Sequence, residues 1–475
     1  QQMKSAPLSL HNTYDLDTAY YTNPVLNSDP NSNDAPACLA SGPQPPAVDW
    51  WWPIRDFSCQ YGWGLRDAGL AADFPTNARM DLAIAAQSGA VPSATPLRGM
   101  IAFTPVPIEA ILRITGPIAM PDYHTTVSAT SLERQIHDFQ LLGQTPAGQD
   151  RKAFTHELSV ALLARLRTLH GAALAPILKV VEQAVRDKEI EIYLTDPAAE
   201  ALLQHLGLAA TIATGNGDGF YVVDANDGGN KANLYVTEHQ TDVVTLLPDG
   251  SALHHLQIAI TYDKIGSVYE GSTGFEDYSD IQRTYLPADA HNLGEAGFTP
   301  PIFTPAGCYS GGYASPVTDC TTAHSVTMPV TTSDVEGRAM VMGPVLVTCG
   351  GLSTLWDYTP TTELATCSTH PVAQIVNIYL TWLTPHAVTL DAQGHGTYTE
   401  LVEKQSGSQT SLSVYVVSPT DAAVTGADAV DPLLDAGYLP ADGVARDAAF
   451  AALVTSATRV YDGPLSADTT ISFHV

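Results

Sequence analysis

Residues 218–236 contain two short β-forming runs on either side of a turn that is rich in Asp, Asn and Gly. Residues 220–223 are aromatic and β-branched, as strands prefer, and residues 234–237 begin a second run of this kind. Residues 224–230 accept positive φ at several positions and can bond their own backbone, which favours a turn. Because helix signals almost vanish after this segment, it divides the chain into two differently built parts.

The part before the turn is expected to be an α/β domain over residues 61–235, preceded by an irregular N-terminal arm over residues 1–60. Residues 23–46 of the arm are rich in Asn, Asp, Pro and Ser, which is typical of loops. Apolar residues recur with a helical period in the domain, and Asp196 with Pro197 forms a helix-start signal. The expected helices are residues 78–88, 107–115, 150–169, 174–186 and 197–206, and the expected strands are residues 99–104 and 190–194.

Short strands separated by turns dominate residues 236–475, which favours a β-sandwich or a barrel. Residues 248–250, Pro-Asp-Gly, predict a hairpin turn. The expected strands are residues 243–247, 253–261, 278–286, 338–348, 372–383, 412–417 and 469–475, with one late helix over residues 444–453. We therefore predict an Ig-like β-sandwich region, as one domain or two subdomains, in a multidomain chain that is α+β overall.

The charge balance restricts the expected partners. The chain has 21 basic and 50 acidic residues and a net charge of −29. Because an acidic surface offers no counter-charge to nucleic acid or to an anionic membrane face, we expect neither partner. An acidic surface keeps a secreted protein soluble, and it also binds divalent cations weakly. Either property explains the excess of acidic residues. No apolar run reaches the roughly 18 residues that a membrane span needs, so no transmembrane segment is expected.

Six cysteines occur as sequence neighbours, which favours three disulfide-closed loops over free buried thiols. They are Cys38, Cys59, Cys308, Cys320, Cys349 and Cys367. About 15 pairings are possible, and the spacing does not select one. Disulfides predict an oxidising, extracytoplasmic location. The chain opens on Gln1 with no visible signal peptide, so we expect any targeting segment to have been removed or to lie outside this sequence.

The oxygen-rich turn is a candidate ligand site through Asp224, Asn226 and Asn230, with Lys231 beside them. Closely spaced oxygen ligands suit Ca²⁺, and Mg²⁺ is the related alternative. The spacing does not match an EF-hand loop, so we favour a turn held by its own side chains and expect no cofactor. Lys231 is then expected to bond loop carbonyls or a carboxylate.

Two adjacent histidines, His254 and His255, lie in an expected strand. Neighbouring side chains of a strand point to opposite faces, which is poor geometry for two ligands of one metal ion. The other histidines are scattered along the chain. We therefore expect no zinc site.

Several short blocks occur in an order typical of one family. They are residues 64–68 (GLRDA) with 73–75 (DFP), 99–102 (GMIA) with 115–118 (TGPI), 150–152 (DRK), 223–226 (VDAN) with 229–232 (GNKA), 283–287 (RTYLP), 335–338 (VEGR), and 403–405 (EKQ) with Gly407. Together they resemble the bacterial domain-of-unknown-function 4012 family over about residues 60–420.

That family is distantly similar to the LytR-CpsA-Psr transferases, which attach lipid-linked glycopolymers to bacterial walls. The resemblance implies a metal-dependent glycopolymer phosphotransferase, with Arg66, Asp67 and Asp73 as candidate residues. An arginine beside carboxylates suits pyrophosphate bound through a divalent metal, and a structural ion pair at a helix entry is the alternative. The family's opening membrane helix, and its block with Glu, Arg and Gly-Gly-Phe, are not found in this chain, so we lean against catalysis.

These observations favour a secreted or surface-displayed bacterial envelope protein with a structural or adhesive role and no catalytic activity. Extended arms and terminal strands can join subunits by strand addition, so a homo-oligomer or filament is the expected assembly. The phosphotransferase is one alternative. The other is a glycan-binding module of the cell wall, in which Trp50, Trp51 and Trp52 stack on sugar rings; such a cluster equally suits a core or an interface.

Overall fold

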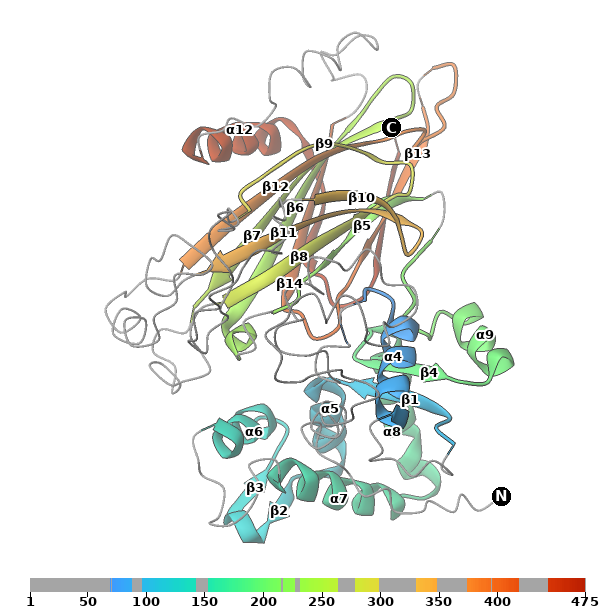
Figure 1. Ribbon diagram of the computed structural model, residues 1–475, viewed down its shortest axis with the longest axis vertical. Coiled ribbons are helices and arrows are strands. Elements are labelled where there is room, and N and C mark those ends of the chain that lie inside the picture. Colours follow the sequence, from blue (N-terminus) through green and yellow to red (C-terminus); the bar gives the residue numbers. More distant parts are fainter. Residues whose placement is uncertain are drawn as a thin grey trace, which may run out of the picture. The chain divides into compact units, whose positions relative to one another are not determined.

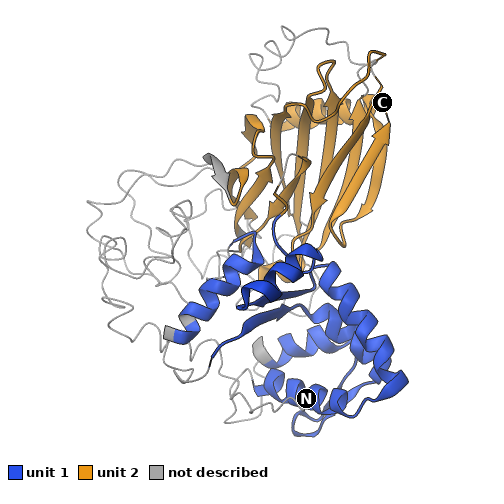
Figure 2. Ribbon diagram, turned by 90° about the vertical axis from the view of Figure 1, so that its right-hand side faces the viewer, with its two compact units in different colours: residues 1–212 blue, residues 213–475 orange. Residues whose placement is uncertain are grey.

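The chain folds into two compact units, residues 1–212 and residues 213–475 (Figure 2). The computed structural model describes residues 69, 71–87, 96–141, 153–214, 217–226, 231–263, 278–298, 330–347, 374–393, 395–417 and 443–474. The sequence analysis ended the α/β domain at residue 235, but β5 (Asp218–Val223) belongs to the second unit. The reason is that β5 pairs with β8 (Tyr278–Leu286) and β13 (Thr397–Glu403), which come much later in the chain.

The first unit is a mixed α/β structure, as expected, built from helices and short strands. The helices are α4 (Phe74–Gln87), α5 (Pro105–Thr115), α6 (Leu132–Leu141), α7 (Ala153–Arg167), α8 (Leu174–Arg186) and α9 (Pro197–His205). The strands are β1 (Gly99–Phe103), β2 (Ile118–Met120), β3 (Thr125–Val127) and β4 (Ile190–Leu194). They form two antiparallel pairs, β1 with β4 and β2 with β3.

An aromatic cluster lies at the centre of the first unit. The rings of Phe139 and Phe154 stack with centroids 4.2 Å apart, and Tyr123 meets both edge-on at 5.0 Å. Arg165 of α7 donates to the carbonyl oxygens of residues 115–117, where α5 ends. This cation satisfies carbonyls that the last helical turn leaves free, so the Thr-Gly-Pro turn has a structural function.

The second unit contains two six-stranded sheets. The first has the order β10-β11-β8-β5-β13-β16, and the second has the order β15-β14-β6-β7-β12-β9. The strands not yet given are β6 (Val236–Leu246), β7 (Ala252–Tyr262), β9 (His291–Ala296), β10 (Val330–Val335), β11 (Arg338–Val347), β12 (Gln374–Thr384), β14 (Thr410–Val417), β15 (Thr458–Pro464) and β16 (Thr469–His474). Each sheet includes one parallel pair, β5 with β13 and β6 with β14.

One hydrophobic core joins the inner faces of both sheets, so the unit is sandwich-like (Figure 1). Phe220, Val222 and Val402 contribute from the first sheet, and Leu256 and Ile378 contribute from the second. Every second residue of each strand faces this core, because side chains alternate along a strand. The strand orders agree with a sandwich but do not by themselves give the expected Ig-like topology.

A late helix, α12 (Gly443–Ser456), covers the outer face of the second sheet (Figure 1). Its Phe450 packs in a separate cluster with Val243 and Tyr379. Tyr379 also hydrogen-bonds Asp447 of the same helix. In β6, β7 and β12, odd-numbered residues such as His255 therefore face the helix-covered side, whereas even-numbered residues face the sandwich core.

The expected helices and strands occur near their expected places. The Pro-Asp-Gly hairpin is present between β6 and β7, and Gly250 at φ 85° donates to Leu247 at 2.9 Å. Residues 236–237 and 243–246 of two expected runs belong to one long strand, β6, whereas residues 234–235 lie in a 3-10 helix, Ala232–Tyr235. β13 was not expected at all. Among the described residues, no helix is both long and apolar enough to cross a membrane.

Candidate functional site

The three residues proposed for phosphotransfer are only partly described. Arg66 and Asp67 lie outside the described residues. Asp73 begins α4: its Oδ2 accepts from the Thr76 N–H at 3.0 Å and from the Thr76 hydroxyl at 2.7 Å. Among the described residues, Arg79 forms an ion pair with Asp73 at 4.0 Å. The described contacts of Asp73 are therefore those of a helix cap.

Asp224 and Asn226 of the oxygen-rich turn form hydrogen bonds with other residues of the chain. The amide of Gln405 brackets the backbone of Asp224, accepting from its N–H at 2.9 Å and donating to its carbonyl oxygen at 2.7 Å. Asn226 donates to the side chain of Asn233. Lys231 is exposed at the surface, and Asn230 lies outside the described residues. The described members are thus held by Gln405 and Asn233, and a turn stapled by its own side chains stays a prediction.

A buried ion pair holds the entry of the chain into the second unit. Arg338 donates to Glu403 at 3.0 Å and to the carbonyl oxygen of Ala213 at 2.9 Å. The other oxygen of Glu403 accepts from the Ala213 N–H at 3.1 Å. Arg338 also donates to the carbonyls of Tyr285 and Leu286. Three of the late sequence blocks, residues 283–287, 335–338 and 403–405, therefore meet at this one structural contact.

The cysteines and the tryptophan cluster lie outside the described residues. They are Cys38, Cys59, Cys308, Cys320, Cys349, Cys367, Trp50, Trp51 and Trp52. The disulfide pairing and the stacking of sugars on the indoles therefore stay predictions.

The most concentrated group of ionisable residues lies inside the sandwich, around His254 of β7. Asp242 of β6 lies 2.8 Å from Nδ1, and Asp218 of β5 lies 3.0 Å from Nε2. Trp382 of β12 stacks on the imidazole with centroids 4.3 Å apart and the ring planes 6° from parallel. We call Asp218, Asp242, His254, Tyr398 and Glu400 the histidine centre.

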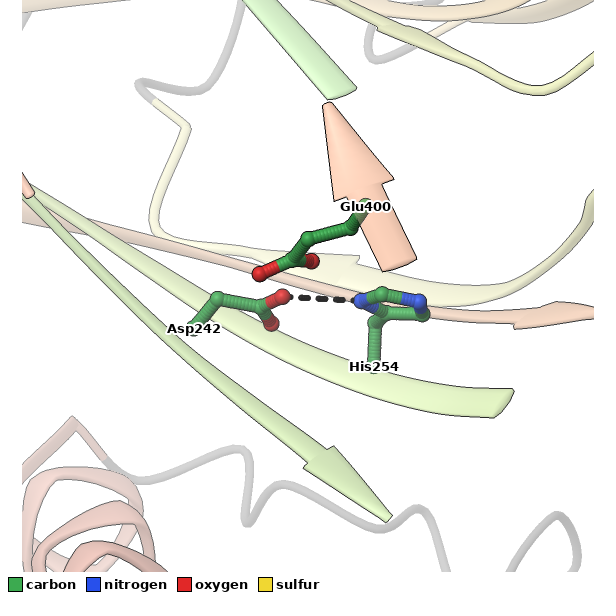
Figure 3. A group of neighbouring side chains, drawn as sticks. All are labelled: Asp242, His254 and Glu400. Carbon is green, nitrogen blue, oxygen red and sulfur yellow. Dashed lines mark hydrogen bonds and ion pairs between the residues drawn. The ribbon is translucent and has the colours of Figure 1, made fainter. Parts of the chain in front are cut away.

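Tyr398 and Glu400 of β13 complete the histidine centre from the other sheet. The Tyr398 hydroxyl lies 2.8 Å from Asp218 Oδ2 and 3.3 Å from Glu400 Oε2, and it donates to one of them at a time. The parallel register of β5 and β13 sets Glu400 beside Asp218. Figure 3 shows the carboxyl groups of Asp242 and Glu400 near the His254 ring. None of these three residues has exposed surface.

The charges of the histidine centre depend on one another. Burial opposes the charged form of His254, but Asp218 and Asp242 outweigh this and raise its pKa well above the ordinary value. Burial likewise opposes ionisation of Asp218, yet the His254 charge and its hydrogen bond hold the pKa of this carboxyl below its usual range. Burial and the neighbouring Asp242 raise the pKa of Glu400 well above its ordinary value. Asp218 and His254 therefore form an ion pair, and Glu400 retains a proton unless a cation replaces it.

Three of these side chains bring potential metal ligands together. One atom each from Asp242, His254 and Glu400 lies within 4.8 Å of the other two. Asp242 Oδ1 and Glu400 Oε1 are buried and have no hydrogen-bond partner among the residues that the structure describes. Buried acceptors of this kind require a proton or a cation, because an uncompensated polar atom in a core is costly.

A second buried group consists of Asp224, Glu238 and Asp280, which we call the acid triad. The carboxyl groups of Glu238 and Asp280 both approach that of Asp224 within hydrogen-bond reach. Gln240 donates to Glu238 at 2.6 Å, and Gln282 donates to Asp224 at 3.2 Å. Burial, together with the nearby Asp224 charge, raises the pKa values of Glu238 and Asp280 well above the ordinary range. Protons therefore link the three carboxyl groups.

The sequence analysis did not identify the histidine centre. It did expect His254 and His255 on opposite faces, and the structure agrees, since His254 contacts Asp218 and Asp242 inside the sandwich. The alternation of side chains along β5 and β6 did contain a signal for this site. Asp218 shares a face with Phe220 and Val222, and Asp242 shares one with Val244, so charged residues stand at core positions of apolar strands.

Comparison with known proteins gives one match. The model of a family described as "Protein of unknown function (DUF4012)" matches residues 39–137. The match supports the resemblance over its first blocks, residues 64–68, 73–75, 99–102 and 115–118. No curated protein and no solved structure matches the chain. The histidine centre lies beyond the matched residues, so its interpretation rests on geometry alone.

Proposed function

We propose that the protein is a non-catalytic structural or adhesive component of the bacterial cell envelope, positioned outside the cytoplasm. The observation that carries this proposal is the closure of the histidine centre. Asp242, His254 and Glu400 have no exposed surface, whereas a catalytic group has to reach its substrate. A sealed group of ionisable residues suits a role in holding two sheets together.

Self-assembly by strand addition is part of this proposal. Within the described residues, β16 and β10 end one sheet, and β15 and β9 end the other. An edge strand carries backbone groups that a second chain can pair with. Thr470 on β16 has an exposed side chain, so this edge can be changed without altering the core.

Sedimentation of the full chain over a wide concentration range tests the assembly. We expect oligomers that dissociate on dilution, and we expect T470K to weaken them because a charge on an edge strand opposes strand pairing. The matched control is T126K, the same change at an exposed position of β3 in the first unit. A monomer at every concentration overturns the assembly, and equal weakening by both variants excludes the β16 edge.

Cell fractionation and an activity assay test the rest of the proposal. We expect an epitope-tagged chain to be accessible to external protease and native material to contain disulfides. The similarity of the resembled family to LytR-CpsA-Psr transferases supplies the rival function, transfer of lipid-linked glycopolymers through Arg66, Asp67 and Asp73. Turnover that D73N abolishes would establish that rival. Retention of the chain in the cytoplasm would overturn the envelope role.

A further inference from the structure

We propose that Asp242, His254 and Glu400 bind one divalent transition-metal ion, zinc by the chemistry of the donors, as a closed structural site inside the β-sandwich. Asp242 and His254 come from β6 and β7 of one sheet, and Glu400 comes from β13 of the other. An ion held by all three therefore ties the two sheets together.

The orientation of the imidazole fits this role. Asp242 and Glu400 lie on the Nδ1 side of the His254 ring, and Nε2 points the other way (Figure 3). In the metal-free chain both nitrogens of His254 carry a proton: Asp218 accepts from Nε2–H at 3.0 Å, and Asp242 accepts from Nδ1–H at 2.8 Å. A bound ion would replace the Nδ1 proton, while Asp218 continues to accept from Nε2–H. A carboxylate that holds the second nitrogen of a ligating histidine is the usual companion of a bound metal.

Two carboxylate oxygens of the proposed metal site have no hydrogen-bond donor among the described residues. Asp242 Oδ1 and Glu400 Oε1 are fully buried and accept no hydrogen bond from the described part of the chain. The histidine centre sets three carboxyl groups against one imidazole in a space with no exposed surface. A divalent ion compensates the charges of Asp242 and Glu400 and occupies their free oxygens at the same time.

The donor set selects the kind of ion. Calcium takes about six to eight oxygen ligands, and magnesium requires an octahedral oxygen shell. One imidazole nitrogen and two carboxylate oxygens instead suit zinc, whose fourth position a water molecule or a second carboxylate oxygen fills. We expected no zinc site because His254 and His255 point to opposite faces and the other histidines are scattered, whereas this site takes one histidine and two acids from other strands.

Metal analysis of the full chain tests the site. The wild-type chain, E400Q and E238Q are expressed with added zinc, dialysed against metal-free buffer and assayed by plasma mass spectrometry. E238Q is the matched control because Glu238 is a buried acid on the same face of β6 as Asp242, outside the ligand group. Both variants keep all six cysteines, so zinc bound by thiols is equal in the three samples.

We expect near-stoichiometric zinc in the wild-type chain and in E238Q, and loss of that zinc in E400Q. D218N, which removes the acceptor behind the imidazole, is expected to lower zinc affinity by about 10–100-fold. Equal zinc in all three samples, or none in the wild-type chain after refolding with zinc, overturns the proposal.

X-ray absorption at the zinc edge keeps the test independent of variant folding. The wild-type spectrum is expected to show nitrogen and oxygen neighbours at about 2.0–2.2 Å, including one imidazole. A first shell of sulfur, or one without imidazole, overturns the site.

Discussion

The histidine centre and the acid triad lie in the same sandwich and compensate buried charge in different ways. Both contain three carboxyl groups, and Asp224, which follows the end of β5, is the one member outside a strand. The histidine centre has a cationic partner in His254, so Asp218 stays ionised. The acid triad has no cation among its three members, so Glu238 and Asp280 hold protons. Burial opposes ionisation of the acids in both groups, and the direct contact with His254 is what keeps Asp218 ionised.

This difference gives the two groups opposite responses to substitution. An ion pair inside a core is costly to break, because the remaining charge has lost both water and its partner. A proton-bridged carboxyl group is already neutral, so an amide of the same shape replaces it at little cost. Substitutions that remove charge should therefore damage the histidine centre and spare the acid triad.

The largest expected effect is that of H254Q. Without the imidazole, Asp218 and Asp242 face each other across the site with no cation between them. We expect the free energy of unfolding of the metal-free chain to fall by about 3–5 kcal/mol, measured by urea denaturation.

The control for H254Q is H239Q, the same change at a partly buried histidine of β6 that bonds Ser411 at 2.6 Å. Its loss should be about 1 kcal/mol, the value of an ordinary hydrogen bond. If H254Q and H239Q lower the free energy of unfolding equally, the His254 ion pair stabilises the sandwich no more than an ordinary hydrogen bond does.

Y398F should have an intermediate effect. It removes the hydroxyl that lies 2.8 Å from Asp218, and a hydrogen bond to a charged group is worth about 1.5–3 kcal/mol. Differential scanning calorimetry should show this loss. Y461F, which removes a hydroxyl bonded to a surface carbonyl, should cost far less. A neutral Y398F would mean that Asp218 is not charged in the folded chain.

The smallest effect, and the most diagnostic for the acid triad, is the pH response of D280N. Because the folded chain holds a proton on Asp280 that the unfolded chain releases above about pH 4, wild-type stability falls as pH rises toward the raised pKa. The slope from this group reaches at most about 1.4 kcal/mol per pH unit. Asp224, Tyr278 and Arg283 are the groups that act on Asp280 electrostatically or by hydrogen bonding.

D280N has no such proton, so its stability should decline less steeply between pH 4 and the raised pKa of Asp280. Urea denaturation at several pH values measures the two slopes. D289N, the same change at an exposed aspartate, should keep the wild-type slope. Parallel curves for the wild-type chain and D280N would show that Asp280 is ionised in the folded state and would remove the contrast between the two groups.

Most elements were predictable because their signals are local. The expected helix at 174–186 and the expected strand at 278–286 coincide with α8 and β8. β13 was missed because Thr-Tyr-Thr-Glu-Leu-Val-Glu has no regular alternation of polar and apolar residues, and the charged Glu400 stands on the core-facing side with Tyr398 and Val402. Since β13 supplies Tyr398 and Glu400, the missed strand is also the reason that the site was missed.

The sequence by itself determined the kinds of element and the alternation of their side chains, because backbone propensity and the two-residue period of a strand act over a few neighbours. It placed His254 and His255 on opposite faces in this way. Only the tertiary structure decided which strands became neighbours. The pairing of β5 with β13 sets Asp218 beside Glu400, and the shared core of the two sheets brings both to His254. Such contacts depend on burying two whole sheets against each other, which no local pattern encodes.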